Sequence, residues 1–427
     1  MGNETKRIRL GGGKKKESKT DRQERIEGWQ QDVLRQARVL VVGAGATGNE
    51  LLKNLALLGV GYVLVCDMDH VDNSNLSRTV LFREEDLNQK KAVVAAQRFQ
   101  EINVEPAARA DYFVGNVCSE LGAGVWNHID VVVSCLDNMQ ARYEASRRCT
   151  LVGKPFIDAG ILELEANVSC FLADEKSPCW GCMYSEKVAS QTRSMQRDSC
   201  DVHKREAWST GHVPTTQVAS ALAAALQSQE VVKCLHYRKA GTMDWIPGRC
   251  YRFNGTYNSF DTMQVMRRES CRDHVRLHTV EQTAFSCDTP LVRVLDYVCA
   301  KYGSDYFLNT EGDYSYRGYG FITKAKCRCC GKPLILNRPG EQIAFDDLFC
   351  PDCPRESNGL SEGWENELLK FSLKDTPPDV LELPLRSLGI PPMHLLQFDS
   401  VEPDRPSIGV ELTADLEKLM PSLPKEQ

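Results

Sequence analysis

The chain has 427 residues, of which 42% are hydrophobic and 26% are charged, and its formal net charge at pH 7 is −6. This length suits more than one domain, and the composition is ordinary for a soluble globular protein. This net negative charge gives no indication of a nucleic-acid-binding surface. No apolar run approaches the length of about 18 residues that marks a membrane span. Residues 1–21 are polar throughout, so we expect no signal peptide.

The 18 cysteines are many for a chain of this length. Several lie in expected core elements, and others form C-x-x-C pairs. This usage fits metal sites in a reducing compartment better than a disulfide framework. We therefore expect a cytoplasmic protein.

The segment from residue 38 to residue 78 predicts a nucleotide site. It opens with the apolar run Val39–Val42, which is typical of a buried parallel strand. Three glycines follow with the spacing GxGxxG, namely Gly43, Gly45 and Gly48. This spacing permits a tight turn, admits phosphate oxygens close to backbone N–H groups and opens a helix whose N-terminus favours anions.

The rest of a βαβ unit follows directly. The helix is expected over Asn49–Leu58, and a second apolar strand over Tyr62–Cys66. Asp67 then stands about 20 positions beyond the glycines, where an acidic residue holds a ribose hydroxyl. The glycine motif alone would also fit a nicotinamide or flavin enzyme.

Polar residues after the second strand argue for triphosphate chemistry instead. Asp69, Asn75 and Arg78 crowd this exit, and Lys90 and Lys91 open the next helix. Cleaving a triphosphate between its α and β phosphates needs cations on the leaving pyrophosphate and a carboxylate for magnesium. The pattern D-x-D-x-V-x-x-S-N-L-x-R, followed by K-A, closely resembles the ThiF/MoeB and ubiquitin-activating adenylyltransferase family. The resemblance covers roughly residues 22–274.

The resemblance implies adenylation of the C-terminal glycine of a ubiquitin-like or sulfur-carrier protein by ATP and Mg²⁺. It puts Arg78 and Lys91 on the ATP phosphates, and Asn75 on a phosphate or on the attacking carboxylate. Asp137, in a D-N-x-x-x-R pattern after an apolar run, would hold magnesium, although an aspartate there could also cap the next helix. The expected ATP-site residues are Gly43, Gly45, Gly48, Asp67, Asp69, Asn75, Arg78, Lys91 and Asp137.

Two further catalytic residues rest on the same resemblance. Arg25 lies in an R-x-x-R pattern whose arginine reaches into the partner subunit's site, which implies a homodimer; a charged helix start is the alternative. Cys200 lies in a polar crossover segment where ubiquitin-activating members form a thioester. Nearby basic residues would favour its thiolate. A free loop cysteine is the other interpretation.

Two sets of metal-ligand spacings predict two structural zinc sites. The pair Cys179 and Cys182 resembles the first half of a family zinc site, whose second half would be Cys271 and His274. A histidine stands there in place of the family's cysteine, and tetrahedral zinc accepts Cys₃His. The second set has zinc-ribbon spacing, C-x₂-C-x₁₉-C-x₂-C, and comprises Cys327, Cys330, Cys350 and Cys353.

The alternation of strands and helices predicts an α/β fold, a doubly wound, mostly parallel, Rossmann-like sheet, with a C-terminal zinc ribbon and a small appendage. We expect a disordered basic arm over 1–21 and an adenylation domain over 22–280, with a crossover loop at 179–210. A helix and strand connector should follow over 281–325, the ribbon over 326–356, and a linker with a small α/β appendage over 357–427.

The predicted function is activation of a ubiquitin-like protein, with thioester formation on Cys200. One alternative is a sulfur-carrier adenylyltransferase without a catalytic thioester. Another is a non-catalytic zinc-ribbon scaffold. The expected partners are a protein ending in glycine, a second copy of the chain and a conjugating enzyme, with no nucleic acid and no membrane.

Overall fold

The structure is a computed structural model that describes residues 18–424 apart from 173, 175, 185–214, 272, 311–319, 328, 345, 346, 348 and 354–363. Its largest sheet has the strand order β3-β2-β1-β4-β5-β6-β7-β8. The first five strands in that order are parallel, and β6, β7 and β8 extend the sheet antiparallel. The strands are β1 (Arg38–Val42), β2 (Tyr62–Cys66), β3 (Arg109–Phe113), β4 (Val131–Ser134), β5 (Phe156–Leu162), β6 (Glu165–Phe171), β7 (Arg249–Asn254) and β8 (Ser259–Gln264).

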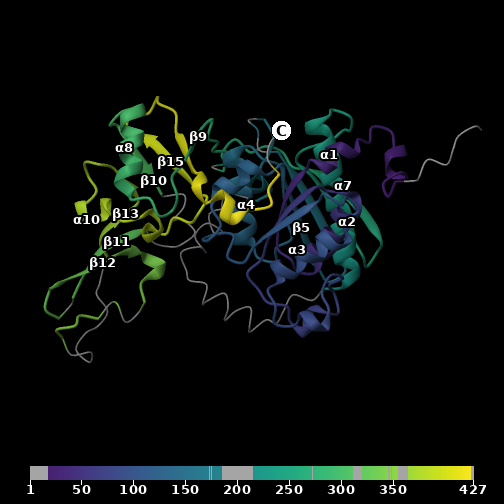
Figure 1. Ribbon diagram of the computed structural model, residues 1–427, viewed down its shortest axis with the longest axis horizontal. Coiled ribbons are helices and arrows are strands. Elements are labelled where there is room, and N and C mark those ends of the chain that lie inside the picture. Colours follow the sequence, from purple (N-terminus) through teal and green to yellow (C-terminus); the bar gives the residue numbers. More distant parts are fainter. Residues whose placement is uncertain are drawn as a thin grey trace, which may run out of the picture.

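Helices cover both faces of the parallel part of this sheet (Figure 1). One face packs against α2 (Ala46–Leu58), α3 (Lys91–Ile102) and α7 (Gln217–Lys239). The other packs against α4 (Met139–Val152) and the 3₁₀ helix η4 (Ala123–His128). Alternate residues of β1 therefore enter two different cores, which explains why that strand is apolar throughout. The expected doubly wound α/β fold is confirmed.

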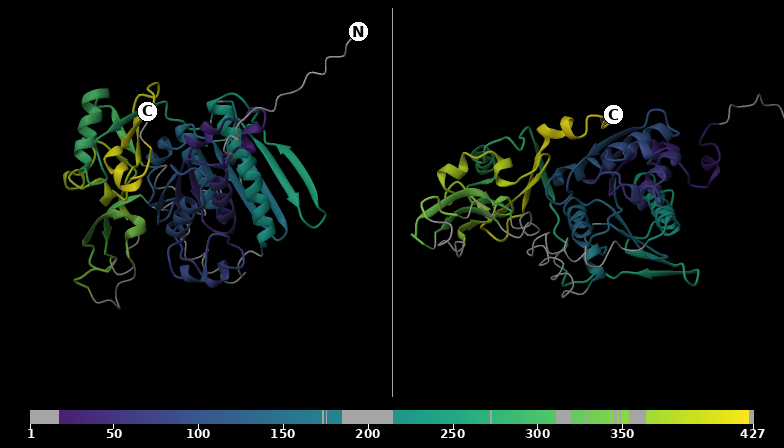
Figure 2. Two further views of the ribbon diagram at one scale, coloured as in Figure 1. Left: turned by 45° about the vertical axis from the view of Figure 1, so that its right-hand side comes forward. Right: turned by 90° about the horizontal axis from the view of Figure 1, so that it is seen from below.

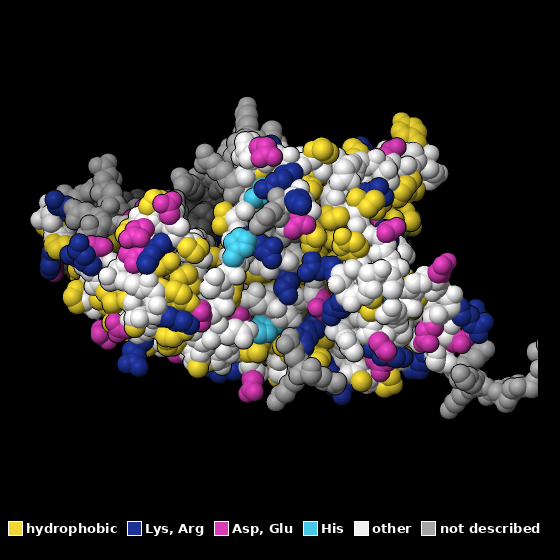
Figure 3. Space-filling view, turned by 90° about the horizontal axis from the view of Figure 1, so that it is seen from above, with side chains coloured by type: hydrophobic (Ala, Val, Ile, Leu, Met, Phe, Trp, Pro, Cys, Tyr) yellow, Lys and Arg dark blue, Asp and Glu magenta, His cyan; other side chains and the backbone are white. Residues whose placement is uncertain are grey.

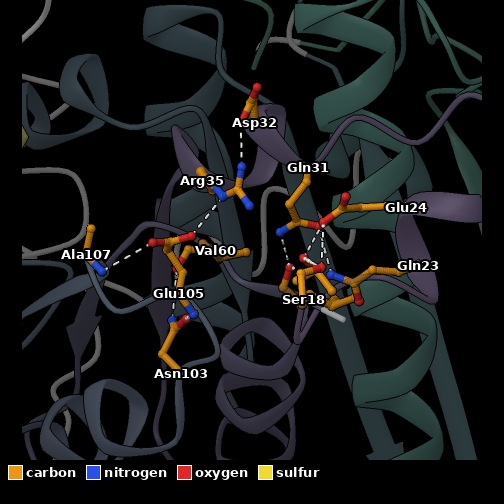
Figure 4. A network of polar contacts seen from close by, with 12 residues as sticks. Ser18, Gln23, Glu24, Gln31, Asp32, Arg35, Val60, Asn103, Glu105 and Ala107 are labelled. Atoms are coloured by element: carbon orange, nitrogen blue, oxygen red, sulfur yellow. Dashed lines mark hydrogen bonds and ion pairs between the residues drawn. The ribbon is translucent and has the colours of Figure 1, made fainter. Parts of the chain in front are cut away.

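The N-terminal segment is fastened to this domain by a polar network (Figure 4). It contains η1 (Gln23–Arg25) and the short helix α1 (Gln31–Arg35). The Gln23 amide donates to Gln31 Oε1 at 2.8 Å, and the Gln31 amide donates to the carbonyl of Leu58 at 2.9 Å. These bonds tie the segment to the C-terminal end of α2.

A second sheet of five strands contains both the expected connector and the expected appendage. Its order is β14-β10-β15-β16-β9, and residues of α8 lie in its core. The elements are β9 (Thr279–Thr283), α8 (Leu291–Tyr302), β10 (Tyr306–Asn309), β14 (Lys370–Phe371), α10 (Pro378–Leu381), η9 (Leu385–Leu388), β15 (Leu395–Ser400), β16 (Ile408–Leu412), η10 (Thr413–Asp415) and α11 (Leu416–Leu419). The segments 281–325 and 357–427 thus fold together, because β10 pairs with β14 and β15.

The cysteine-rich segment forms a third, three-stranded sheet between β10 and β14 in the sequence. Its order is β12-β11-β13, with η6 (Gly340–Gln342) after β12. The strands are β11 (Phe321–Lys326), β12 (Pro333–Pro339) and β13 (Trp364–Leu368). We call residues 279–424, with both smaller sheets, the C-terminal unit. In Figure 2 this unit, green to yellow, lies beside the larger sheet.

Polar contacts join the C-terminal unit to the domain that contains the larger sheet. Glu411 of β16 is buried, and its carboxylate contacts His128 Nε2 at 2.6 Å and accepts from the Asn127 amide at 2.9 Å. The N–H of Gly124 also donates to the carbonyl of Met393 at 2.8 Å. The described helices include no segment with the length and apolarity of a membrane span.

Candidate active site and metal centres

The glycine loop lies between β1 and α2, at the carboxyl edge of the parallel strands. Gly43 has a φ of +95°, and a Cβ atom there would stand 2.6 Å from the carbonyl oxygen of Cys135. A Cβ at Gly48 would collide with the carbonyl oxygen of Gly43. A Cβ at Gly45 would meet no atom within 4 Å, so this turn faces open space. The loop therefore offers backbone N–H groups and a helix N-terminus to an anion.

Asp67 organises the base of this loop. Its carboxylate accepts from the backbone N–H of Ala44 at 2.7 Å and from that of Asp69 at 2.8 Å. Burial raises the pKa of the Asp67 carboxyl above its ordinary value, and the two N–H groups and the charge of Lys91 oppose that effect. The side chain thus joins the end of β2 to the glycine loop.

Lys91 begins α3 and points back toward the end of β2. Its ammonium group forms an ion pair with Asp69 at 2.9 Å, and only 10% of its side chain is exposed, against 58% for Asp69. An ion pair with one exposed partner can exchange that partner for a stronger anion. Lys90 precedes the helix as its N-cap residue and donates no capping bond.

Asn75 and Arg78 lie on the loop that follows β2. Asn75 is buried in the short helix η2 (Asn73–Asn75), and its Oδ1 accepts from the N–H of Asp72 at 2.9 Å. Arg78 is half-buried, and its guanidinium donates to the carbonyl of Ser74. Arg78 forms no ion pair with any described residue, so its charge is available.

Asp137 follows β4 on an exposed turn. The cap of the next helix is Asn138, whose Oδ1 accepts from the N–H of Ala141 at 2.7 Å. Asp137 therefore does not serve as the helix cap, and no hydrogen bond or ion pair joins it to another described residue. Cys135, two residues earlier, donates its backbone N–H to Val42 at 2.8 Å, so this turn adjoins the glycine loop.

Two predicted catalytic residues, Arg25 and Cys200, are not found on the loops at the carboxyl edge of the sheet in the described structure. Arg25 lies in η1, 71% of its side chain is exposed, and it pairs with Asp21 at 2.5 Å. Cys200 belongs to the segment 185–214, which lies outside the described residues.

The first predicted metal site comes together from two distant segments. The ligand atoms of Cys179, Cys182, Cys271 and His274 all lie within 4.8 Å of one another. The Sγ of Cys179 lies 3.8 Å from that of Cys182 and 3.6 Å from that of Cys271. Two thiolates on one tetrahedral zinc, each about 2.3 Å from it, would lie about 3.8 Å apart. The donor set therefore fits zinc. The thiols of Cys179 and Cys271 donate toward Cys182 and lower its pKa, which favours the thiolate that a metal needs.

The second predicted site lies at the ends of the three-stranded sheet. The sulfur atoms of Cys327, Cys330, Cys350 and Cys353 also lie within 4.8 Å of one another. The turn between β11 and β12 supplies the first two, and Gly331 in that turn has a φ of +72°. Its N–H donates to the carbonyl of Cys327 at 2.9 Å. This four-thiol set also fits a tetrahedral zinc ion.

Asp158 is a residue of this site that the sequence analysis missed. It lies on β5, 4% exposed, and its Oδ2 contacts Arg142 at 3.1 Å and accepts from the Trp180 indole at 3.0 Å. Arg142 in turn donates to the carbonyl of Leu136, beside Asp137. Asp158 therefore links the first metal cluster to the Asp137 turn. Its signal was a carboxylate inside an apolar run, FIDAGI.

Comparison with known proteins finds relatives of two kinds. A segment of 158 residues is 37% identical to the sulfur carrier protein adenylyltransferase of Thermus thermophilus, covering 36% of this chain and 58% of that protein. A segment of 152 residues is 36% identical to SUMO-activating enzyme subunit 2 of Dictyostelium discoideum, covering 35% of this chain and 22% of that protein. A segment of 146 residues is 40% identical to ubiquitin-activating enzyme E1 2 of Arabidopsis thaliana, covering 32% of this chain and 13% of that protein. The chain thus spans less than two thirds of each of these relatives.

Among solved structures, the crystal structure of E. coli MccB with ATP is 21% identical in sequence, with a TM-score of 0.46. That likeness covers 57% of this chain and 68% of the MccB chain. The ThiF family matches residues 20–273, which is more than half of the chain and includes every candidate residue of the nucleotide site. The chain therefore belongs to the ThiF family.

Proposed function

We propose that this protein adenylates the C-terminal glycine of a ubiquitin-like protein and then holds that glycine as a thioester on Cys200. The observation that carries the adenylation step is one group of side chains at the carboxyl edge of the parallel sheet. The segments that follow β1, β2 and β4 present an open glycine turn at Gly45, the cations Arg78 and Lys91, and the Asp137 carboxylate, which forms no hydrogen bond or ion pair with another described residue. A triphosphate needs this combination of donors and charges.

In the adenylation step, a carboxylate oxygen of the partner's terminal glycine attacks the α-phosphorus of ATP. The bond from that phosphorus to the bridging oxygen breaks, and pyrophosphate leaves with the electron pair. Arg78 and Lys91 would neutralise the charge on the leaving group, while the glycine loop holds the phosphates. No general base is needed, because the attacking carboxylate is already ionised.

Asp137 is the residue we assign to Mg²⁺. Its carboxylate is exposed. Within the described part of the chain it forms no ion pair with a basic side chain, and it does not cap a helix. Asp137 would supply the oxygen ligand that a hard divalent cation prefers, and the bound cation would offset the negative charge of the phosphates. Asp69 would release Lys91 to the phosphates as ATP enters.

The second step would transfer the glycine acyl group to sulfur. The Cys200 thiolate attacks the acyl carbon, and AMP leaves from the mixed anhydride. Support for this step comes from the sequence, where Arg197, His203 and Lys204 lie close by. The similarity to ubiquitin- and SUMO-activating enzymes also favours it. A conjugating enzyme would then receive the thioester, and a second copy of the chain would supply Arg25.

A second candidate function is sulfur-carrier adenylation without a thioester. The similarity to a sulfur carrier protein adenylyltransferase, 37% identical over 158 residues, favours it. The two functions share the first step and differ at Cys200.

The deciding experiment combines the protein with ATP, Mg²⁺ and a small protein ending in glycine. Mass spectrometry should detect an acyl-adenylate, followed by a covalent adduct that thiols cleave and that Cys200→Ala lacks. Acyl-adenylate formation should persist in that variant, because adenylation precedes attack by the thiol. An adenylated partner without any adduct would favour the sulfur-carrier function. A partner that is never adenylated would refute both.

A further inference from the structure

Asn49 connects two parts of the nucleotide site that are distant in sequence. It lies in the first turn of α2 and is 0% exposed. Its amide nitrogen donates to the carbonyl of Ala44 at 2.7 Å and to that of Gly45 at 3.1 Å. Both acceptors belong to the glycine loop. The donor end of this side chain therefore fixes the backbone that would receive the phosphates.

The acceptor end of the same side chain reaches the loop that carries Arg78. Asn49 Oδ1 accepts from the backbone N–H of Leu81 at 3.0 Å. Leu81 is 3% exposed, so this N–H has no access to solvent. The segment between Asn75 and Leu81 is itself held together, since the hydroxyl of Thr79 donates to the carbonyl of Asn75 at 2.9 Å. Anchoring Leu81 therefore anchors Asn75 and Arg78 as well.

The chemistry of the position requires an amide. A buried side chain there must donate to two carbonyls and accept from one N–H, and among side chains of this size asparagine does both. Aspartate would put a carboxylate oxygen against two carbonyl oxygens. An apolar residue would leave the N–H of Leu81 buried and unpaired.

We propose that Asn49 is a positioning residue for adenylation, which sets the distance between the glycine loop and Arg78. This inference rests on the proposed function, because it matters only if both segments hold one triphosphate. The glycine loop binds phosphates that stay with AMP or bridge to it, while Arg78 stabilises the group that leaves. Asn49 would hold the glycine loop and Arg78 at the spacing that lets both bind the phosphates of one ATP molecule at the same time.

The chain supplies a matched control in Asn103. It is also a buried asparagine, 8% exposed, and lies just after α3. Its amide donates to the carbonyl of Val60 at 3.0 Å, and its Oδ1 accepts from the N–H of Glu105 at 2.8 Å (Figure 4). Asn103 thus joins two segments by the same kinds of bond, just beyond the opposite end of α2 from Asn49. Its loss should cost stability without touching the nucleotide site.

The test compares Asn49→Ala with Asn103→Ala in the full chain. Both should lower Tm by similar amounts. In the ATP–pyrophosphate exchange reaction, Asn49→Ala should lower kcat about tenfold or more, since a misplacement of about 1 Å can cost about 100-fold. KM for ATP should rise less, because Lys91 and Asp67 still bind the ground state. Asn103→Ala should leave kcat and KM unchanged below its Tm.

Equal kinetic effects in the two variants at equal loss of Tm would overturn the inference. If Asn49→Ala does not fold, Asn49→Ser, with a hydroxyl in the same helical turn, takes its place in the same comparison. A wild-type chain that exchanges no pyrophosphate would refute the proposed function instead. Calorimetry would then test Asn49: the dissociation constant for ATP should rise modestly in Asn49→Ala and not in Asn103→Ala, and equal values in the two variants would overturn its role.

Discussion

At the scale of single residues, the site depends on side chains whose neighbours leave them free to meet a ligand. Asp137 is exposed and Arg78 is half-buried, while the neighbouring residues Asn138 and Asn75 are engaged in local hydrogen bonds. This division between holding and acting residues lets a substitution at Asp137 change chemistry without changing the fold.

Asp137→Ala should abolish magnesium-dependent pyrophosphate exchange and leave Tm unchanged. No hydrogen bond or ion pair joins the carboxylate to another described residue, and the helix cap stays on Asn138, so the fold should not depend on Asp137. Activity assays over a range of Mg²⁺ concentrations, together with thermal unfolding, would measure both effects. Exchange at the wild-type rate would remove Asp137 from the magnesium site.

The sequence indicated residues that share one local motif better than residues whose contacts come from distant segments. Gly43, Asp67 and Arg78 carry a motif whose spacing is visible in one segment. Asn49 and Asp158 belong to no such motif. Asn49 contacts Leu81 and Asp158 contacts Arg142, and only the fold brings these segments together. A polar residue within an apolar or helical pattern was the available signal for both.

At the scale of elements, α4 carries a buried ionic network between the Asp137 turn and η4. Arg148 is 0% exposed, pairs with Glu144 at 2.7 Å, and donates to the carbonyls of Val117, Cys118 and Leu121. Burial alone would raise the pKa of Glu144. The charges of Arg147 and Arg148, with their hydrogen bonds, outweigh burial and hold that pKa below its ordinary value of 4.5.

This network predicts a pH-dependent loss of stability in Glu144→Gln. Because the folded-state pKa lies below the unfolded value of 4.5, the stabilisation is full above that pH and declines as pH falls through the folded pKa. Denaturant unfolding should show a deficit of about 3 kcal/mol at neutral pH, as for a buried pair that loses one partner. The deficit should shrink in acid. Glu101→Gln, in an exposed pair with Arg98, should cost far less at every pH. A pH-independent deficit would contradict the ionic account.

Two metal clusters define a second element-scale prediction. Elemental analysis of the purified protein should find two zinc ions per chain, one for each group of four ligands. His274→Ala should lower that number by one, because removal of one of four ligands opens the first site. A count of two in this variant would exclude His274 as a ligand. A count below two in the wild type would remove a cluster from this account.

Regular elements with long apolar patterns were predicted well, and irregular ones were not. The strand Tyr62–Cys66 has the expected bounds, and the helix expected over Asn49–Leu58 ends at Leu58 as predicted. The five-stranded sheet was not recognised as one sheet, because its strands are short and the ribbon separates β10 from β14. Pairing between segments so far apart leaves no local signal.

At the scale of the whole molecule, charge is distributed unevenly. The chain carries a net charge of −6, yet Lys and Arg side chains gather at the middle of the face that Figure 3 shows. Burial lowers the pKa of Lys154, and the nearby charges of Arg238 and Lys239 add to this effect. Lys154 donates to the carbonyl of Asn127, which adjoins the contact between His128 and Glu411. Lys154 therefore lies near the junction with the C-terminal unit.

Arg25 tests whether a second copy completes the site. Its side chain is exposed and held only by Asp21 in the described structure, so it can reach outward. If it acts in a partner, mixing Arg25→Ala with Asp137→Ala should restore part of the exchange activity, since one composite site would be intact. Each variant alone is the control. Full activity from a species that light scattering identifies as a monomer would end the proposal of action in trans.

In the proposed reaction, the site transfers AMP from ATP to a terminal glycine carboxylate. This transfer can be measured by the exchange of radiolabelled pyrophosphate into ATP, with candidate ubiquitin-like and sulfur-carrier proteins as substrates. We predict that label enters ATP only with Mg²⁺ and an intact C-terminal glycine, and that Arg78→Ala abolishes it. Exchange that persists after the partner's glycine is removed, or no exchange with any such partner, would contradict the account.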